Sequence, residues 1–177
     1  MISFSNPRKI ISSLNVPPDA HIADFGSGTG VYSLLLAEGY PQRTIFAIDI
    51  QKELVASLGK EAEKRGLRNV HTVWGDIDEI KGSFLRDDSM DYVFLVNTLF
   101  QVEDPIITLR EAKRVLKQDG RLILIDWVDS YGNLGPHEDH VISQERAIQL
   151  AEELGFIQEA NMEDVGEHHY GIIFRKI

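Results

Sequence analysis

Short apolar runs alternate with longer amphipathic segments along most of the chain. The apolar runs predict buried strands at 20–25, 43–49, 69–76, 90–98 and 121–126. Between them, apolar residues recur at helical spacing and predict helices at 31–40, 51–66 and 104–119, the last beginning near Pro105 and ending before Gly120. A further periodic segment at 4–14 predicts a leading helix, which the prolines of "NVPP" end.

This alternation predicts how the strands are arranged. Strands so apolar, separated by helices, are typical of a parallel sheet that is covered on both faces and joined by right-handed crossovers. The fold class is therefore α/β, doubly wound. The tail departs from the rhythm, because a helix at 143–156 is followed by two strands, 156–165 and 168–177, with no helix between them. Two such strands must pair antiparallel.

Composition and charge limit the class of protein. The 177 residues fit one domain, 1–177, and no apolar run approaches the length of about 20 residues that a membrane span needs. The chain has no cysteine and no apolar signal segment at its start, so we expect a soluble, cytoplasmic protein without membrane insertion. A net charge of −10 repels a phosphate backbone, so we expect no nucleic-acid partner.

The stretch "IADFGSGTG", residues 22–30, runs from a predicted strand through three glycines into a predicted helix. Glycines at such a strand end let the backbone turn tightly and approach a ligand closely. The next strand ends at Asp49, where a carboxylate can accept hydrogen bonds from ribose hydroxyls. Together the turn and Asp49 predict a site for a ribose-containing ligand.

Two residues argue against a dinucleotide. The dinucleotide fingerprint G-x-G-x-x-G requires glycine three residues after Gly28, and Val31 stands there. Asp24, two residues before the first glycine, places a carboxylate where a pyrophosphate would lie, and the two would repel each other. The turn suits a ligand with a positive charge, such as the ammonium group of an amino acid.

These residues carry a family resemblance. "IADFGSGTG" resembles the first motif of the class I S-adenosylmethionine-dependent methyltransferases, and "VEDPIITLREAKRVLKQDGRLILIDW" is similar to their fourth-to-fifth-strand region. The similarity runs over 20–127, and the closing helix and strands also fit. Within the class, the chain resembles the small single-domain branch that includes ubiquinone and menaquinone C-methyltransferases (methyltransferase type 11). The resemblance implies a seven-stranded, mostly parallel, Rossmann-like sheet whose last strand is antiparallel, and S-adenosyl-L-methionine as the cofactor.

The resemblance also assigns the cofactor contacts. It implies that the methionine part is held at Asp24, at the glycine turn and by the backbone of Asn97, and the ribose at Asp49. The adenine would lie against residues that follow the second and third strands. The implied cofactor-binding set is Asp24, Gly26, Ser27, Gly28, Gly30, Asp49, Ile50, Asp76, Ile77 and Asn97. Alternatives stay open within this set, since Asp76 could cap a turn, Ile50 and Ile77 could be core residues, and Asn97 could be a turn residue at the strand end.

The methyl acceptor should be held by loops at the same edge of the sheet. The leading segment, 1–16 with Phe4, is a candidate lid, and the polar loop 127–143 is a candidate wall of the acceptor site. The candidate acceptor residues are Phe100, Trp127, His137 and His140. At Phe100 and Gln101 the related sequences often carry histidine, so a histidine-dependent mechanism does not transfer. The histidines and acids of 137–140 are adjacent in one loop and rarely converge on a metal, so no metal is expected.

Three functions fit these observations to different degrees. The favoured function is methyl transfer from S-adenosylmethionine to a small-molecule acceptor by in-line displacement. Such a displacement mainly needs the acceptor aligned, so no catalytic residue is assigned. An oxygen or carbon acceptor would gain from a general base, for which His137 and His140 are candidates, whereas an amine would need only orientation and desolvation. The alternatives are a cofactor-binding partner subunit without transfer activity and, less favoured, an NAD-dependent oxidoreductase.

Overall fold

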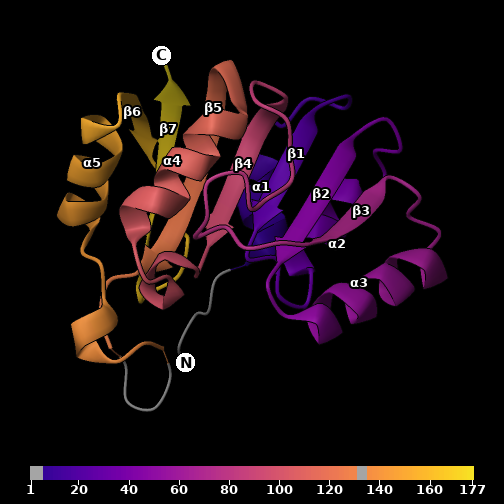
Figure 1. Ribbon diagram of the computed structural model, residues 1–177, viewed down its shortest axis with the longest axis horizontal. Helices are drawn as coiled ribbons and strands as arrows, with labels where there is room; N and C mark the ends of the chain where they lie inside the picture. The colour runs from indigo at the N-terminus through magenta and orange to yellow at the C-terminus, as the bar shows by residue number, and fades with distance from the viewer. Residues whose placement is uncertain (1–5, 131–134) are drawn as a thin grey trace.

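The computed structural model describes residues 6–130 and 135–177 and arranges them around one seven-stranded sheet (Figure 1). Its strand order is β3-β2-β1-β4-β5-β7-β6. Every neighbouring pair is parallel except those of β7, which runs antiparallel to both β5 and β6. The strands are β1 His21–Phe25, β2 Thr44–Asp49, β3 Val70–Trp74, β4 Met90–Val96, β5 Leu116–Trp127, β6 Phe156–Asn161 and β7 His169–Lys176. The predicted fold class and the antiparallel tail are confirmed.

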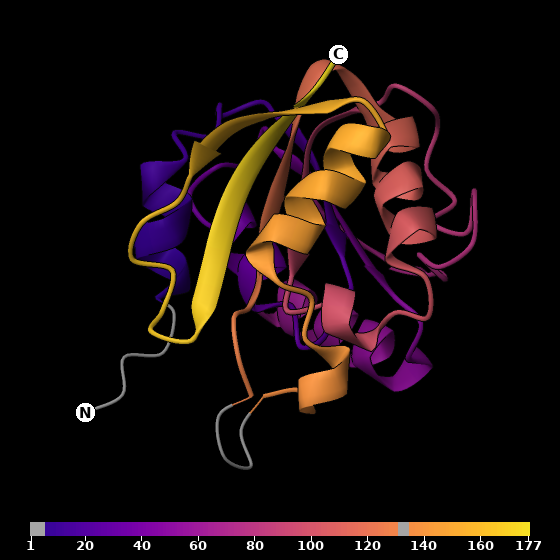
Figure 2. The same ribbon diagram turned by 90° about the vertical axis from the view of Figure 1, so that its left-hand side faces the viewer.

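Helices cover both faces of the sheet, as the alternation predicted (Figures 1 and 2). On one face lie α1 Pro7–Ser13, α2 Val31–Ala37 and α3 Lys52–Lys64. On the other lie α4 Pro105–Val115 and α5 Gln144–Glu153. Two short 3₁₀ turns, η1 Leu99–Gln101 and η2 Glu138–His140, follow β4 and β5. Among the described residues, none of the helices has the length and apolarity to cross a membrane.

The alternating side chains of the central strands fill both halves of the core. In β1, Ala23 and Phe25 are fully buried against the α4 and α5 side, whereas Ile22 is fully buried on the α1 and α2 side. Because β1 is covered on both faces, its apolar residues point to both sides of the sheet rather than to one side only. The sequence pattern of this strand therefore followed directly from its central place in the sheet.

One predicted boundary is wrong. The helix expected over 104–119 ends at Val115, and β5 begins at the next residue. Leu116 pairs with Met90 of β4, whereas the following pair is Arg121 with Tyr92, so residues 117–120 bulge out of the ladder. Pairing with the neighbouring strand thus ends the helix earlier than the local helix propensity of "LKQD" would.

The connection from β3 to β4, residues 75–89, contains no helix and is held by α4 instead. Glu111 of α4 is fully buried, and its carboxylate accepts hydrogen bonds from Ser83 Oγ (2.5 Å) and Lys81 N (2.8 Å). Arg114, one turn further along α4, donates to the same carboxylate at 2.7 Å. This buried network fixes the connection that carries the chain from the sheet edge back to its centre.

Candidate cofactor and acceptor site

The glycine turn lies where the strand order reverses. The chain moves outward from β1 to β2 and β3, then returns to β4 on the other side of β1. In open α/β sheets, ligands bind in the crevice beyond the carboxyl ends of the strands at such a point. Residues 26–30 follow β1 at this point, between the ends of β2 and β4. The turn is therefore placed as the sequence predicted.

Most N–H groups of the turn are engaged within the chain. Gly26 N and Ser27 N both donate to Ile48 O at 2.9 Å, and Gly30 N donates to Ser27 O at 2.8 Å. Gly28 N donates to Asp49 Oδ2 at 2.8 Å. A phosphate bound at such a turn would need free N–H donors. Their engagement disfavours a phosphate and suits a ligand that donates hydrogen bonds itself.

The carboxylate of Asp24 lies at the N-terminus of α2. Its Oδ2 accepts hydrogen bonds from Ser33 N (3.1 Å) and Ser33 Oγ (2.6 Å), and the residue is only 3% exposed. Burial raises the pKa of Asp24 to about 6, although the two Ser33 hydrogen bonds oppose the rise. An acidic side chain of the chain itself therefore sits where dinucleotide-binding folds hold a ligand phosphate.

Asp49 anchors the turn from the end of β2. Its Oδ2 accepts from Gly28 N and its Oδ1 from Gln51 N at 2.9 Å. An ionised carboxylate has about four acceptor positions, so these two bonds leave capacity for ribose hydroxyls. Asp49 is 7% exposed, so it is largely buried and still reaches the surface at the end of β2.

Two of the predicted adenine contacts meet in one hollow of about 230 Å³. Ile50 is 59% exposed there, and the lining residues are Ile50, Trp74, Gly75, Asp76, Glu79, Gly82 and Phe84. Asp76 also caps a turn, because its Oδ1 accepts from Asp78 N at 2.9 Å. The third predicted contact, Ile77, is only 8% exposed and belongs to the core on the α4 side. The structure thus separates the Ile77 side chain from the open hollow.

Two buried oxygens at the site lack hydrogen-bond partners within the described part of the chain: Ser27 Oγ and Asn97 Oδ1. Asn97 follows β4 with a φ of 53°, and its carbonyl accepts from Gln101 Nε2 at 2.7 Å. Buried polar atoms without partners are rare in native proteins. One lies in the turn and the other follows β4 next to Thr98, whose side chain lies against Gly26, so both fit a polar ligand group that supplies the missing partners, such as the aminoacyl end of S-adenosylmethionine.

Gly30 has a packing role that the sequence did not suggest. A Cβ atom at this position would lie 2.1 Å from Leu58 Cδ1 of α3. In contrast, a Cβ atom on Gly28 would meet nothing closer than Gly26 O at 4.0 Å. Gly30 therefore lacks a side chain because α2 and α3 pack closely there, whereas the space beside Gly28 is open.

The predicted acceptor residues divide into two groups. A hollow of about 530 Å³ is lined by Leu99, Phe100, Gln101, Val102, Glu103, Asp139, His140 and Ile142. It joins two of the four candidates, Phe100 and His140. His137 is largely exposed beside this hollow, with Nδ1 3.3 Å from the Asp139 carboxylate. Trp127 packs on His169 instead, with ring centroids 4.3 Å apart. Phe4 lies outside the described residues, as do residues 131–134 of the expected wall.

Sequence reasoning missed Asp126 at the end of β5. Its carboxylate accepts from Leu99 N and Trp127 N, each at 2.8 Å, and so fixes the turn that carries Phe100. Burial raises the pKa of Asp126 to about 6, against the lowering effect of these backbone hydrogen bonds. The sequence could have indicated Asp126, because the run "RLILID" ends in an acid, as the second strand does at Asp49.

Comparison with known proteins fits this geometry. A model of a family described as "Methyltransferase domain" matches residues 18–161. The chain belongs to this methyltransferase family. The family confirms the resemblance read from 20–127, and it covers the sheet from β1 to β6.

The chain is similar to the solved structure of a SAM-dependent methyltransferase from Aquifex aeolicus, with a TM-score of 0.84 and 26% sequence identity. The match covers 98% of this chain and 91% of that one. A demethylmenaquinone methyltransferase of Listeria welshimeri is 28% identical over 120 residues, 67% of this chain and 50% of that protein. A ribosomal RNA small subunit methyltransferase A of Salinibacter ruber is 32% identical over 101 residues, 56% of this chain and 32% of that protein.

The chain thus spans half or less of the length of these two curated relatives. The family and the structural match imply S-adenosylmethionine as the cofactor, as the sequence predicted.

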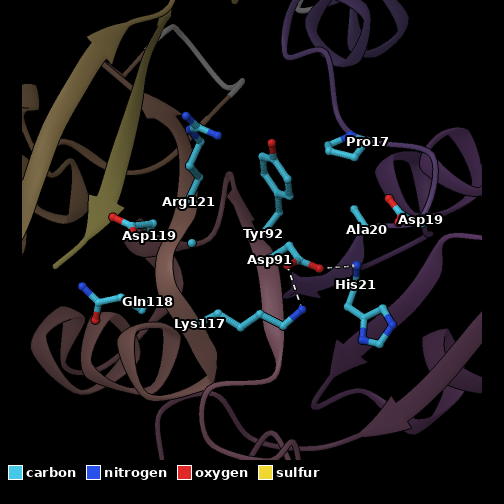
Figure 3. A pocket seen from close by; sticks show the side chains of 11 residues that line it. Pro17, Asp19, Ala20, His21, Asp91, Tyr92, Lys117, Gln118, Asp119 and Arg121 are labelled. Carbon is cyan, nitrogen blue, oxygen red and sulfur yellow. Dashed lines mark hydrogen bonds and ion pairs between the residues drawn. The ribbon is translucent and has the colours of Figure 1, made fainter.

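The methyltransferase domain has another hollow, of about 360 Å³, at the opposite edge of the sheet, beside the starts of β1 and β4 and the bulge before Arg121 (Figure 3). Its central carboxylate, Asp91, is paired with Lys117 Nζ at 2.8 Å and with His21 N at 2.8 Å. Arg121 is paired with Glu159. Because its main charges are satisfied within the chain and the glycine turn lies at the other edge, this hollow is not a candidate for the cofactor.

Proposed function

We propose that the chain binds S-adenosylmethionine at the glycine turn and transfers its methyl group to a small-molecule acceptor, as a class 2.1.1 methyltransferase. The observation that carries the proposal is the Asp24 carboxylate at the start of α2, beside a turn whose N–H groups are engaged. This arrangement disfavours a pyrophosphate, and with it the NAD-dependent oxidoreductase, and it favours a cationic aminoacyl group.

The proposed cofactor contacts run from the hollow of Ile50 and Asp76 to the glycine turn. The adenine would lie by Ile50 and Asp76, and the ribose at Asp49. The Ile77 side chain belongs to the core, so its predicted adenine contact would be made by its backbone. The methionine part would lie along the turn, between Ser27 and Asn97, whose buried oxygens lack partners in the described residues. The proposed methionine-binding residues are Asp24, Gly26, Ser27, Gly28 and Asn97.

When bound, the cofactor supplies a methyl group that its sulfonium makes electrophilic. The chain's own residues then have to align the acceptor and exclude water. Phe100 and His140 face the same hollow, so they would hold the acceptor there, and Asp126 would keep the turn of Phe100 in place. His140 is the candidate group to accept a proton from an oxygen or carbon acceptor.

A small-molecule acceptor is favoured over a nucleic acid by charge. The relative from Salinibacter ruber is named for ribosomal RNA, so the family fold also serves that substrate class. The present chain has a net charge of −10, however, and phosphate backbones are bound by clustered Lys and Arg. We therefore propose a small molecule.

Calorimetry tests the cofactor assignment. We expect S-adenosylmethionine and S-adenosylhomocysteine to bind and NAD not to bind. Asp49→Ala should weaken S-adenosylmethionine binding by more than tenfold, about 1.4 kcal/mol, because the carboxylate organises the turn and holds the ribose. Binding of NAD alone would refute the proposal, and unchanged affinity in Asp49→Ala would remove the ribose assignment.

Release of S-adenosylhomocysteine distinguishes an enzyme from a cofactor-binding partner subunit. Purified chain would be incubated with S-adenosylmethionine and a set of quinones, phenols, amines and carboxylates. We expect release with at least one acceptor class. Tight cofactor binding without release from any acceptor would favour the partner-subunit alternative.

A further inference from the structure

The hollow of Phe100 and His140 is acidic as well as apolar. Four of its lining residues, Leu99, Phe100, Val102 and Ile142, are apolar, and two, Glu103 and Asp139, are carboxylates. None of the described lining residues is Lys or Arg. At about 530 Å³ the hollow lies within the range of about 300–1,000 Å³ that is usual for small-molecule sites.

The two connections that form this hollow extend the same charge. The described parts of these connections, residues 97–104, 127–130 and 135–143, contain five acidic residues, Glu103, Asp104, Asp129, Glu138 and Asp139, and neither Lys nor Arg. Two of these acids are engaged locally, since Asp104 caps α4 through Ile106 N and Asp129 pairs with His168. Of the other three, Glu103 and Asp139 line the hollow, and Glu138 lies outside its lining. Asp139 also lies 3.3 Å from Nδ1 of the exposed His137.

Three cations of α1 and α3 have partners of their own. Arg8 and Lys9 of α1 pair with Glu38 and Asp164, and Lys52 lies over the Trp74 ring at the other hollow, 3.8 Å from the centroid. A cleft lined by one sign of charge concentrates ligands of the opposite sign and repels those of its own sign. Carboxylate and phosphate acceptors are therefore disfavoured in the hollow of Phe100 and His140.

We propose that the methyl acceptor is an amine with an apolar body, bound as its ammonium form between Glu103 and Asp139 with the apolar part against Phe100 and Ile142. The amine assignment rests on the proposed methyl transfer and specifies its substrate class. It also fits the exposed position of His140, because transfer to an amine needs orientation and desolvation rather than a strong general base.

The reaction balances without a further co-reactant. The bound ammonium loses one proton to water at the open mouth of the hollow, which frees the nitrogen lone pair. That lone pair forms the N–CH₃ bond while the S–CH₃ bond breaks, and the electron pair of the broken bond stays on sulfur. The products are a methylated ammonium and the thioether S-adenosylhomocysteine, so substrate and product both carry the positive charge that the carboxylates favour.

Matched acceptors test the charge preference. Phenethylamine, 2-phenylethanol and 3-phenylpropanoate share an apolar body and differ in charge, and benzylamine and tryptamine with their alcohol and carboxylate counterparts extend the series. Calorimetric binding to the complex with S-adenosylhomocysteine reports affinity without turnover. We expect at least one amine to bind ten times more tightly than its alcohol, no carboxylate to bind, and added salt to weaken the amine.

Variants locate the charges that matter. Glu103→Gln combined with Asp139→Asn should raise the Kd of that amine at least tenfold and leave the Kd for S-adenosylhomocysteine within twofold. Glu138→Gln, in the same loop but outside the lining, is the matched control and should change the amine Kd less than twofold. An equal effect of the control and the double variant would overturn the assignment to Glu103 and Asp139.

Cofactor binding and amine preference are separate measurements, so the proposed function and the amine assignment can fail independently. If S-adenosylmethionine and S-adenosylhomocysteine do not bind, the proposed function fails. If the cofactor binds but no amine in the series binds more tightly than its uncharged counterpart, or a phenol or carboxylate is methylated in preference, only the amine assignment fails.

Discussion

At the scale of single residues, two buried carboxylates hold the glycine turn and the start of α2 in place. Asp24 serves α2 as a bound anion serves the corresponding helix of dinucleotide-binding folds, through Ser33 N and Ser33 Oγ. Asp49 binds two backbone N–H groups and holds Gly28 in place. Both positions could be selected from the sequence by their distance from the glycines. Their hydrogen-bond partners could not, because the side chains meet only when β1, β2 and α2 come together.

Gly28 allows a residue-scale prediction, because the protein leaves open space around it. Gly28→Ala should weaken S-adenosylmethionine binding at least tenfold, since a methyl group would enter the space at the ligand edge. The positive φ of 54° should cost about 1 kcal/mol of unfolding free energy. Calorimetry and urea unfolding measure the two effects.

Gly39→Ala is the matched control for Gly28→Ala. Its φ of +75° imposes a similar backbone cost, and nothing lies within 4 Å of the added Cβ atom. It should lower stability to a similar extent and leave cofactor affinity unchanged. A loss of affinity in Gly28→Ala no larger than in Gly39→Ala would show that the ligand does not approach Gly28.

At the scale of elements, contacts between neighbours set what each segment does. The strand, turn and helix of 20–40 agree with their sequence pattern, because the apolar run, the glycines and the periodic segment all favour the same structure. The end of α4 disagrees, because Leu116 pairs with Met90 of β4. The contact between Gly30 and Leu58 is another example, since α2 and α3 approach too closely for a side chain there.

That contact gives a prediction for Gly30→Ala. We expect it to lower the free energy of unfolding by about 1–3 kcal/mol more than Gly39→Ala does, because the added Cβ atom would overlap Leu58 as well as adopt a positive φ. Urea unfolding of both variants measures the difference. Equal losses would mean that α3 moves away without cost.

The buried network on α4 gives another prediction. Glu111→Gln should lower the free energy of unfolding by about 3 kcal/mol, because it removes the charge that Arg114 and the 81–83 backbone contact in a buried place. The exposed pair of Glu61 and Arg65 on α3 is the matched control. Glu61→Gln should leave the urea midpoint unchanged within error, and similar shifts in both variants would contradict the role of burial.

At the scale of the whole molecule, the two edges of the sheet differ in how their charges are paired. The amino ends of the strands satisfy their charges internally, as the Asp91 and Lys117 pair shows (Figure 3). The carboxyl ends present the turn, two hollows and an excess of acids. Two buried acids at this edge, Asp24 and Asp126, have pKa values raised to about 6 by burial.

These pKa values predict how stability depends on pH. Between about pH 4 and 6 the folded state holds protons on Asp24 and Asp126 that the unfolded state has released, since their ordinary pKa is 3.8. The unfolding free energy should therefore fall as pH rises through this window, by at most about 1.4 kcal/mol per pH unit for each group, and level off above about pH 7. Acids whose pKa is lowered, such as Glu111, oppose this trend only at lower pH.

Asp24→Asn isolates one group, because an amide oxygen can still accept both Ser33 hydrogen bonds. Urea unfolding at pH 5, 6, 7 and 8 should show a smaller fall for the variant than for the parent chain. Burial lowers the pKa of His169, so this residue makes stability rise with pH, opposite to Asp24. Because His169 is present in both proteins, its contribution cancels when the two profiles are compared. Parallel profiles for the two proteins would show that Asp24 does not titrate in this window.

The sequence by itself determined the features that depend on local order. The apolar runs and helical periodicity specified the doubly wound α/β class, the antiparallel tail and the position of the glycine turn. The spacing of Asp24, Asp49 and Val31 also predicted a ribose-containing ligand with a positive charge, because a strand, a turn and a helix in succession fix those distances within about 30 residues.

Only the tertiary structure decided which distant side chains meet. It joined Phe100 to His140 in one hollow and left His137 and Trp127 outside it. It also placed Asp126 under the turn of Phe100 and ended α4 at Val115. These outcomes depend on strand pairing and loop packing between residues far apart in the chain, and periodicity along the sequence carries no information about such contacts.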